Sequence, residues 1–383
     1  MRRGISATLG LVALLAVPTT AGAEEVIVKY KPGASKSALA ERAGLSTVLG
    51  TVAANGAQVV AVADAKDAAA ILNRSAAVEY AEPNVELKAF GVPNDARFGE
   101  LYGLSNANDA DMDAPEGWDL AGYPNLPAIT VGIVDTGIDA AHEDLSGKVV
   151  ACGRVQLLTN RVVEGSCNDD NDHGTHVAGT IAAKANNSVG VAGVSYNSNL
   201  AICKALNAVG SGTTAGVANC ITYLAGKGVK IISMSLGGGA SSTLQTAVRD
   251  ASSRGSLIIA AAGNDGDATL NYPAAYPEVV SVAATDRNDA RASFSNANAD
   301  VEIAAAGVNV LSTKRGGGYV AFSGTSMATP HVAGVAALIA AKNPALTATQ
   351  IRSKLQTSVD DKGAAGRDPQ FGFGRVNLVK ALS

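Results

Sequence analysis

The chain has 383 residues, of which 47% are hydrophobic, 17% charged and 4% aromatic, and its formal net charge is −4. This length predicts one large core and a smaller second one, and the composition is that of a globular enzyme rather than a disordered or fibrous chain. Because no basic run occurs, we expect neither nucleic acid nor a membrane surface as a partner.

The first 23 residues have the pattern of a secretory signal peptide. Met-Arg-Arg-Gly is followed by an apolar run over residues 9–17, and Ala-Gly-Ala at 21–23 precedes two glutamates. A basic start, a short apolar core and small residues at the end are typical of such signals, and the run is too short to cross a bilayer. We therefore expect a secreted protein, although the pattern does not separate the medium from a periplasm.

Residues 24–89 alternate strand and helix patterns in the order β-α-β-β-α-β. The strands are expected at 25–30, 47–52, 58–62 and 78–84, the helices at 35–43 and 65–74, and Asn55-Gly56 is a strong hairpin signal. This order predicts a small α+β domain of ferredoxin-like type with both helices on one face of its sheet. Its boundary is expected in the Gly- and Pro-containing segment 90–95.

Beyond residue 127 the strands become continuous apolar runs separated by helices. They are expected at 129–134, 200–206, 229–234, 257–262, 279–283 and 301–305. Runs of this kind predict an α/β fold, a three-layer α/β/α arrangement with a mostly parallel central sheet. Functional residues are then expected beyond the carboxyl ends of the strands.

The four cysteines are consistent with an oxidising compartment, and their even number suggests disulfides, with three pairings open. Cys152–Cys167 and Cys203–Cys220 are the favoured local pairs. Buried free thiols are the alternative, chiefly for Cys203 in its apolar run, whereas no Cys-x-x-Cys spacing suggests zinc.

Three short motifs place reactive side chains at the ends of predicted elements. Asp135 follows the 129–134 strand in Asp-Thr-Gly, His173 opens the small-residue helix His-Gly-Thr-His-Val-Ala-Gly-Thr, and Ser326 opens another in Gly-Thr-Ser-Met-Ala-Thr-Pro. Nucleophilic acyl transfer needs three groups: a hydroxyl that attacks, a base that takes the hydroxyl proton, and a carboxylate that orients the base. Each residue alone could be a turn or cap residue, but their joint occurrence favours catalysis.

The three motifs, in the order Asp, His, Ser, resemble the catalytic signatures of the subtilisin-like serine proteases. The resemblance implies that Ser326 is the nucleophile, His173 the general base and then acid, and Asp135 its orienting partner. Asn264, in Ala-Ala-Gly-Asn, matches the family's oxyanion donor. Residues 24–89 resemble the inhibitory propeptide, which also acts as a folding template, and 90–383 resemble the catalytic domain.

The same resemblance implies that an extended peptide is held as an added strand between two backbone segments. The matching positions are Ser211, Gly212, Ser235, Leu236, Gly237 and Gly238. An apolar, Gly-lined pocket between 235–238 and 261–264 would accept a large apolar side chain. The sequence thus predicts a monomeric, broad-specificity serine endopeptidase of proteins and peptides, made as a zymogen that cuts itself between Leu87 and Val92.

A structural calcium site, with no organic cofactor, is implied by similarity to thermitase-like members. Calcium needs several oxygen ligands, and the matching positions are the side chains of Asp95, Asp144 and Asn187 with the carbonyl oxygens of Lys184, Val189 and Val191. Ordinary polar turns are the alternative reading of these residues. The likeness is incomplete, because Val177 replaces the cysteine that those members carry after the catalytic histidine.

Competing classes fit the sequence less well. An α/β-hydrolase needs the order Ser, acid, His, and a metalloprotein using His173 and His176 needs a His-Glu-x-x-His motif, whereas Gly and Thr stand between these histidines. A non-catalytic binding member would not need competent residues at all four catalytic positions. We expect His176 and His331 to be structural or to support the catalytic residues from behind, and His142 to be a loop residue.

Overall fold

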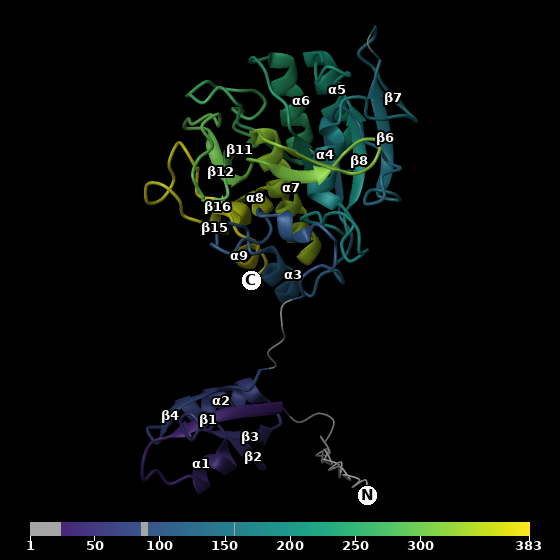
Figure 1. Cartoon of the computed structure of the whole chain (residues 1–383). Coiled ribbons are helices and arrows are strands. Elements are labelled where there is room, and N and C mark those ends of the chain that lie inside the picture. The colour runs from purple at the N-terminus through teal and green to yellow at the C-terminus, as the bar shows by residue number, and fades with distance from the viewer. Residues whose placement is uncertain (1–23, 86–90, 157) are drawn as a thin grey trace, which may run out of the picture. The chain divides into compact units, whose positions relative to one another are not determined.

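The computed structural model describes residues 24–85, 91–156 and 158–383, which form two separate units, one before and one after the gap at 86–90 (Figure 1). The predicted signal peptide and most of the predicted cleavage segment lie outside the described residues. Each unit is therefore considered by itself.

The smaller unit has the predicted β-α-β-β-α-β order. Its elements are β1 (Glu24–Tyr30), α1 (Ser37–Arg42), β2 (Val48–Thr51), β3 (Gln58–Val62), α2 (Ala65–Asn73) and β4 (Val78–Pro83). The strands form an antiparallel sheet in the order β2-β3-β1-β4. Alternate residues Val26 and Val28 of β1 are buried against Leu72 of α2, so the unit has a core of its own.

A ten-stranded sheet organises the larger unit. Its order is β15-β16-β12-β11-β10-β9-β5-β8-β6-β7, and every neighbouring pair is parallel except β15-β16 and β6-β7 at the two edges. The strands are β5 (Thr130–Asp135), β6 (Val149–Val155), β7 (Val162–Glu164), β8 (Asn199–Lys204), β9 (Ile231–Met234), β10 (Leu257–Ala261), β11 (Val279–Thr285), β12 (Val301–Ala306), β15 (Val359–Asp360) and β16 (Arg375–Val376). The predicted mostly parallel sheet is confirmed.

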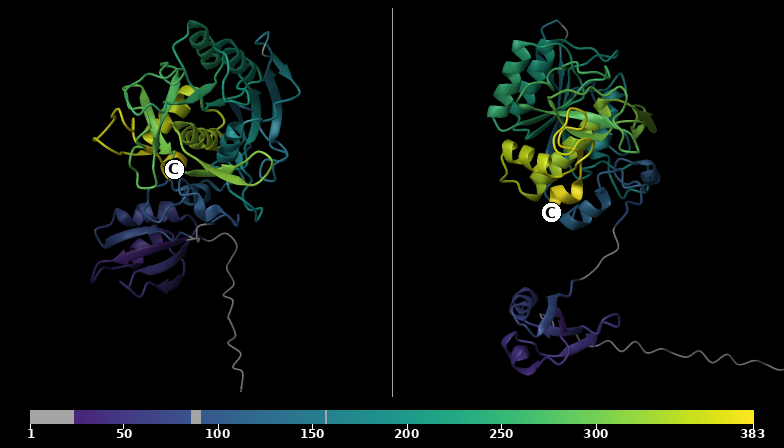
Figure 2. Two further views of the ribbon diagram at one scale, coloured as in Figure 1. Left: turned by 45° about the horizontal axis from the view of Figure 1, so that its top comes forward. Right: turned by 90° about the vertical axis from the view of Figure 1, so that its left-hand side faces the viewer.

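Helices cover both faces of this sheet, as the three-layer prediction requires (Figures 1 and 2). On one face lie α5 (Thr214–Gly226) and α6 (Ser242–Ser253); on the other lie α4 (His173–Ala182), α7 (Thr325–Lys342) and α8 (Ala348–Thr357). The short helices η1 (Phe98–Glu100), α3 (Ala114–Ala121) and α9 (Leu378–Leu382) complete the unit. Within β5, Ile133 packs in the α4–α7 layer and Val134 in the α5–α6 layer, so both faces of the strand are buried.

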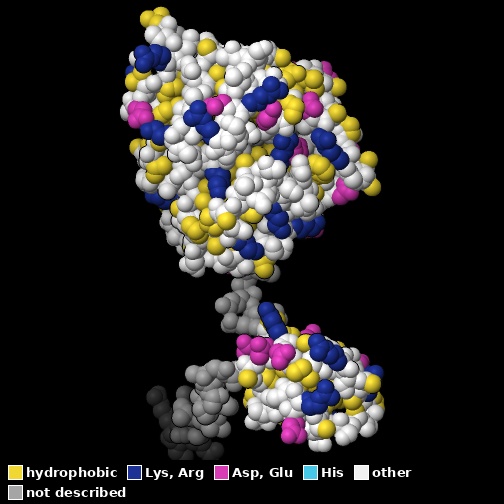
Figure 3. All heavy atoms as spheres, turned by 180° about the vertical axis from the view of Figure 1, so that it is seen from behind, with side chains coloured by type: hydrophobic (Ala, Val, Ile, Leu, Met, Phe, Trp, Pro, Cys, Tyr) yellow, Lys and Arg dark blue, Asp and Glu magenta, His cyan; other side chains and the backbone are white. Residues whose placement is uncertain are grey.

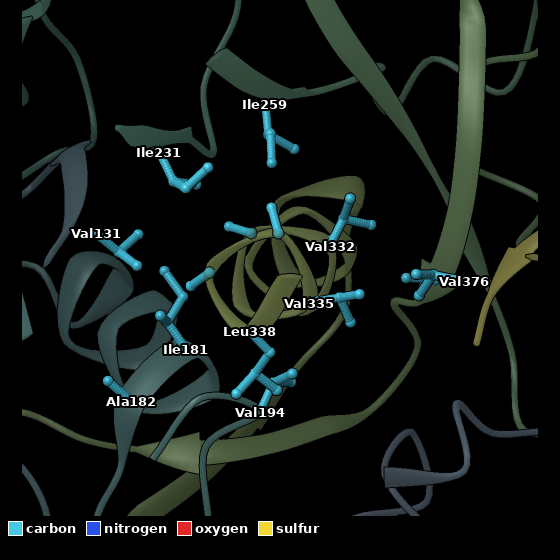
Figure 4. Close-up of a cluster of buried hydrophobic side chains, with 14 of the residues drawn as sticks. Val131, Ile181, Ala182, Val194, Ile231, Ile259, Val332, Val335, Leu338 and Val376 are labelled. Carbon is cyan, nitrogen blue, oxygen red and sulfur yellow. The ribbon is translucent and has the colours of Figure 1, made fainter. Parts of the chain in front are cut away.

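Helix α7 is the centre of the larger core. All of its 18 residues except Ser326 and Lys342 are buried, and small residues such as Ala333, Gly334 and Ala337 allow neighbouring elements to pack closely. Figure 4 shows Val332, Val335 and Leu338 on different sides of α7, with Val335 directed toward Val376 and Leu338 toward Val194. The helix that begins beside Ser326 is thus held by the whole fold.

A two-stranded hairpin outside the main sheet, β13 (Val310–Thr313) and β14 (Tyr319–Phe322), packs on α4. The hydroxyls of Ser312 and Thr313 donate to the carbonyl oxygens of His176 and Thr175 at 2.7 Å. The hairpin therefore supports the helix that begins at His173.

Both favoured disulfides are confirmed. Cys152 of β6 is bonded to Cys167 and Cys203 of β8 to Cys220 of α5, with Cα–Cα separations of 5.4 and 5.6 Å. The alternative of free thiols is therefore wrong. Over the part of the chain that the structure describes, no helix combines the length and the hydropathy needed to cross a bilayer. On the face in Figure 3, basic and acidic side chains are interspersed.

Candidate active site

The end of β5 and the start of α4 are in direct backbone contact. A Cβ atom placed on Gly174 would lie 2.2 Å from the carbonyl oxygen of Gly137, so no larger residue fits there. Gly137 itself has φ +117°, in the region that favours glycine. The glycines of the Asp-Thr-Gly and His-Gly-Thr-His motifs therefore bring Asp135 and His173 together.

The side chains of Asp135 and His173 share a hydrogen bond of 2.8 Å between Oδ1 and Nδ1. Asp135 is fully buried, and its Oδ1 also accepts from the Thr136 amide at 2.6 Å. Burial by itself lowers the pKa of His173, but the charge and hydrogen bond of Asp135, with the charge of Asp169, raise it above its usual value. The pair can therefore hold a proton on the imidazole.

Ser326 is the second residue of α7 and is partly exposed. Its hydroxyl donates to the carbonyl oxygen of Ser235 at 3.2 Å, while the Ser235 hydroxyl donates to the carbonyl oxygen of Ser326 at 2.7 Å. Within the described residues, no hydrogen bond joins Ser326 to His173. Ser235 and His173 nevertheless line the same cleft.

Asn264 follows β10 and is fixed by one end of its amide. Its Oδ1 accepts from the backbone N–H and the hydroxyl of Thr325, both at 2.9 Å, whereas its Nδ2 donates to no residue that the structure describes. A Cβ atom on Gly324 would lie 3.6 Å from the Ser326 nitrogen and 3.7 Å from Asn264 Nδ2. Glycine at 324 therefore leaves the space beside these two nitrogens free of a side chain of its own.

The predicted substrate segments line one open cleft of about 560 Å³ together with His173. They are Ser211, Gly212, Ser235, Leu236, Gly237 and Gly238. Gly238 pairs through its backbone with Tyr272, at 2.9 Å in both directions. Two predicted backbone segments therefore border the same cleft.

Val217, Leu244 and Tyr272 are among the residues that line this cleft and that sequence reasoning missed. Val217 and Leu244 occupy apolar positions of α5 and α6 that a helical pattern assigns to the core. Tyr272 lies in a loop, where its pairing with Gly238 gives no local signal.

The other histidines have structural contacts. His176 is buried, its Nε2 is bonded to the Val310 carbonyl at 2.9 Å, and its ring stacks on Phe322. His331 is bonded through Nδ1 to the Met327 carbonyl at 2.8 Å. Burial lowers the pKa of His176 to about 3 and that of His331 to about 4, so both are neutral at ordinary pH.

His142 lies in a loop, as expected, but it is buried and bonded at both ring nitrogens. Nε2 is bonded to the Gly318 carbonyl at 2.8 Å, and Nδ1 accepts from the Asp144 amide at 3.1 Å. This contact joins the β13–β14 hairpin to the segment that carries Asp144.

The residues predicted to bind calcium come from three segments. Asp144 is fully buried and accepts from Asn187 Nδ2 at 2.7 Å and from the Val191 amide at 3.1 Å. Asp95 is 5% exposed; its Oδ2 accepts from the Asn186 amide at 2.7 Å, and its buried Oδ1 has no partner among the described residues. Burial raises the pKa of Asp95, and the charge of Asp144 acts in the same direction.

The backbone around these carboxylates also has unused oxygen atoms. In the described part of the chain, the carbonyl oxygens of Lys184, Val189 and Val191 accept no hydrogen bond. Buried carboxylates and carbonyl oxygens that accept no hydrogen bond are the ligands that a hard cation prefers. Asp144 Oδ2, however, also accepts from the Tyr319 hydroxyl at 2.9 Å. One detail differs, because Asn187 presents Nδ2 rather than Oδ1 to Asp144.

Comparison with known proteins matches two families to the two units. Residues 127–374 match the subtilase family, and residues 23–84 match the fervidolysin N-terminal prodomain.

Individual relatives extend over most of the chain. Thermitase of Thermoactinomyces vulgaris is 42% identical over 292 residues, 76% of this chain and 99% of thermitase. A thermophilic serine proteinase of Bacillus sp. (strain AK1) is 39% identical over 315 residues, 82% of this chain and 74% of that protein. A solved structure of proteases from Pseudoalteromonas arctica PAMC 21717 superposes with a TM-score of 0.69 at 32% identity, over 76% of this chain and 99% of that chain.

The prodomain match shows that the protein is made as a zymogen. Together with the relatives, the match over residues 127–374 shows that the chain is a serine endopeptidase and belongs to the subtilase family.

Proposed function

We propose that this endopeptidase hydrolyses peptide bonds through Ser326, His173 and Asp135, with an acyl-enzyme intermediate. The observation that carries the proposal is the 2.8 Å hydrogen bond between His173 and the buried Asp135, at a cleft that Ser235 also lines. His173 takes the Ser326 proton as the hydroxyl attacks the carbonyl carbon, then gives that proton to the leaving amine. Asp135 keeps the imidazole oriented and stabilises its charged form.

The developing oxyanion is bound by two N–H donors, the Ser326 backbone amide and Asn264 Nδ2. Support comes from the Thr325 bonds that hold the Asn264 amide and from the space left beside Gly324. Donors fixed before the reaction need no reorganisation when charge develops.

Broad specificity follows from how the cleft would hold its substrate. The backbone of 211–212 and 235–238 pairs with an extended peptide, and main-chain pairing selects little among side chains. We propose that proteins and peptides of varied sequence are substrates, with a large apolar side chain favoured before the scissile bond.

The precursor is organised as a signal peptide over 1–23, an inhibitory propeptide over 24–89 and a catalytic domain over 90–383. We propose that the protein is secreted, cuts itself between Leu87 and Val92 and acts as a monomer. N-terminal sequencing of the secreted enzyme tests the boundary, and a first residue outside this window contradicts it.

Calcium is the proposed structural ion, held by Asp95, Asp144 and Asn187 with the three carbonyl oxygens. The unpartnered Asp95 Oδ1 beside the charge of Asp144 supports this. A bound cation would offset the repulsion between the two carboxylates and tie residue 95 to the loop after α4.

The decisive experiment expresses the full precursor with Ser326→Ala beside the parent and measures maturation and casein digestion. The parent should do both and the variant neither. A variant that matures and digests casein refutes the assignment, and failure of both proteins favours a binding role.

The two histidines of the His-Gly-Thr-His motif form a matched pair. His173→Ala should abolish hydrolysis in a folded protein, whereas His176→Ala should mainly weaken folding, because His176 fills a buried site against Phe322. Equal loss of intrinsic activity in two equally folded variants contradicts this division.

A further inference from the structure

A second buried carboxylate, that of Asp169, lies beside the proposed triad. Asp169 is 7% exposed and sits in the loop between the disulfide-bonded Cys167 and the start of α4. Its backbone amide donates to Ile138 at 3.1 Å, and the Ile138 amide donates to Cys167 at 2.9 Å. The residue is therefore fixed through its backbone on the segment that follows β5.

Five hydrogen bonds converge on the Asp169 carboxylate. Oδ1 accepts from the Thr136 hydroxyl at 2.8 Å and from the amides of Asn171 and Asp172 at 3.0 and 3.3 Å. Oδ2 accepts from the amide and the hydroxyl of Thr175 at 2.9 and 2.6 Å. A carboxylate with this many donors is held in one orientation.

The two threonines among these donors belong to the segments that carry Asp135 and His173. Thr136 directly follows Asp135, and Thr175 is two residues after His173 in the first turn of α4. Thr136 Oγ1 also accepts from the Gly174 amide at 2.8 Å. The Asp169 carboxylate therefore joins the end of β5 to the start of α4 from a third segment.

The negative charge of Asp169 also affects the pKa of His173. Burial opposes ionisation of Asp169, but the bonds from Thr175, Asn171 and Thr136 outweigh it and lower the Asp169 pKa, so the group stays anionic. Its charge adds to that of Asp135 in raising the pKa of His173.

Two further acidic residues precede His173 in the sequence, and each forms an ion pair with a basic residue. Asp172 lies 3.4 Å from Arg315 of the β13–β14 turn, and Asp170 is bonded to Lys204 at 2.6 Å. His176, on the same helix, is buried and neutral.

We propose that Asp169 is a positioning residue for His173, which holds the imidazole against Asp135 and stabilises the imidazolium formed when Ser326 loses its proton. The inference rests on the proposed triad. The proton passes from Ser326 Oγ to His173 and on to the leaving amine, and Asp169 neither gains nor loses one.

The test compares Asp169→Asn with Asp170→Asn in the full precursor, after maturation and with active sites counted by a covalent serine-directed reagent. Asp170 is a matched control, since its side chain is 52% exposed and paired with Lys204. Asp169→Asn should lower kcat by between about tenfold and a hundredfold with little change in KM. The acid limb of kcat/KM should also move to lower pH, because an anion that favours the charged imidazole is lost.

Asp170→Asn should match the parent both in kcat and in the pH of the acid limb of kcat/KM. The proposal is overturned if Asp169→Asn has the parental kcat. It is also overturned if kcat falls while the acid limb stays at the parental pH, because a purely structural role would lower kcat without moving the limb. The results for these variants are interpreted only if the parent is active and Ser326→Ala is inactive. Failure of the proposed triad is thereby distinguished from failure of the role proposed for Asp169.

Thr175→Val is the second variant if Asp169→Asn does not fold. It removes the Thr175 hydroxyl, which donates to Asp169 and accepts from the Asp139 amide at 3.0 Å, and it keeps the Asp169 charge. Because the charge remains, the readout is the division between kcat and KM rather than the acid limb: kcat should fall severalfold with KM unchanged, and Thr175→Ser, which keeps the hydroxyl, should restore it. Parental kcat in a folded Thr175→Val, or a loss that Thr175→Ser does not restore, overturns the proposal.

Discussion

In the proposed mechanism Asn264 Nδ2 binds the oxyanion while Oδ1 holds Thr325, and two substitutions can separate these two roles. Asn264→Asp keeps an oxygen for the Thr325 N–H and hydroxyl but removes the Nδ2 donor. Loss of one oxyanion donor costs about 3 to 4 kcal/mol of transition-state stabilisation, which lowers kcat by about 10²–10³-fold. The melting temperature should remain near that of the parent, because Thr325 keeps its acceptor.

Asn264→Ala removes both ends. The same loss of kcat should then be joined by a loss of about 1–3 kcal/mol of stability, because the fully buried Thr325 is left with an unpaired N–H. This corresponds to a fall of several degrees in melting temperature.

Turnover of a chromogenic peptide, normalised to titrated active sites, gives kcat. Calorimetry on enzyme inactivated at its serine gives stability without self-digestion. Asn264→Asp with a kcat within about threefold of the parent refutes the oxyanion assignment. Asn264→Ala as stable as Asn264→Asp refutes the supporting role of Oδ1.

Three further predictions concern stability. Because the pKa values of His176 and His331 are lowered to about 3 and about 4, the unfolded chain takes up protons below its own pKa of about 6.5 while the folded chain does not. The folded state should lose up to about 1.4 kcal/mol per pH unit for each histidine on acidification from pH 6 to 5, and a flat melting temperature over that range would contradict their burial as neutral groups. Reduction of the disulfides, whose cysteines are 15 and 17 residues apart, should destabilise by about 3 kcal/mol each, measured by denaturant unfolding with and without reductant; equal midpoints would refute this. A chelator should lower the melting temperature and added calcium restore it, while Asp144→Asn should respond to neither; an equal response in parent and variant contradicts the calcium site.

The sequence predicted the core strands well because each is a continuous apolar run that both helical layers bury. It did not predict β6, whose residues are mostly half-buried or exposed, since it lies near the sheet edge and beside a polar loop. The β13–β14 hairpin was also missed: its strands are four residues each and its turn contains Gly316, Gly317 and Gly318.

At the candidate site, the sequence motifs predicted that Asp135 and His173 lie together, and the structure has them at hydrogen-bond distance. The role proposed for Asp169 had no such signal, because its partners Thr136 and Thr175 are ordinary turn and helix residues in sequence. Their convergence depends on a contact between the backbones of Gly137 and Gly174, which no local pattern encodes.

The burial of α7 has a consequence for how long a protease survives among copies of itself. A helix that is mostly apolar and buried on nearly all sides is not expected to remain ordered in water once its neighbours leave, so partial opening of the core is disfavoured. Cleavage of the inner segments by another molecule then has to wait for the whole larger unit to open. The lifetime of the enzyme in its own solution should follow the rate of global unfolding rather than the mobility of any one loop.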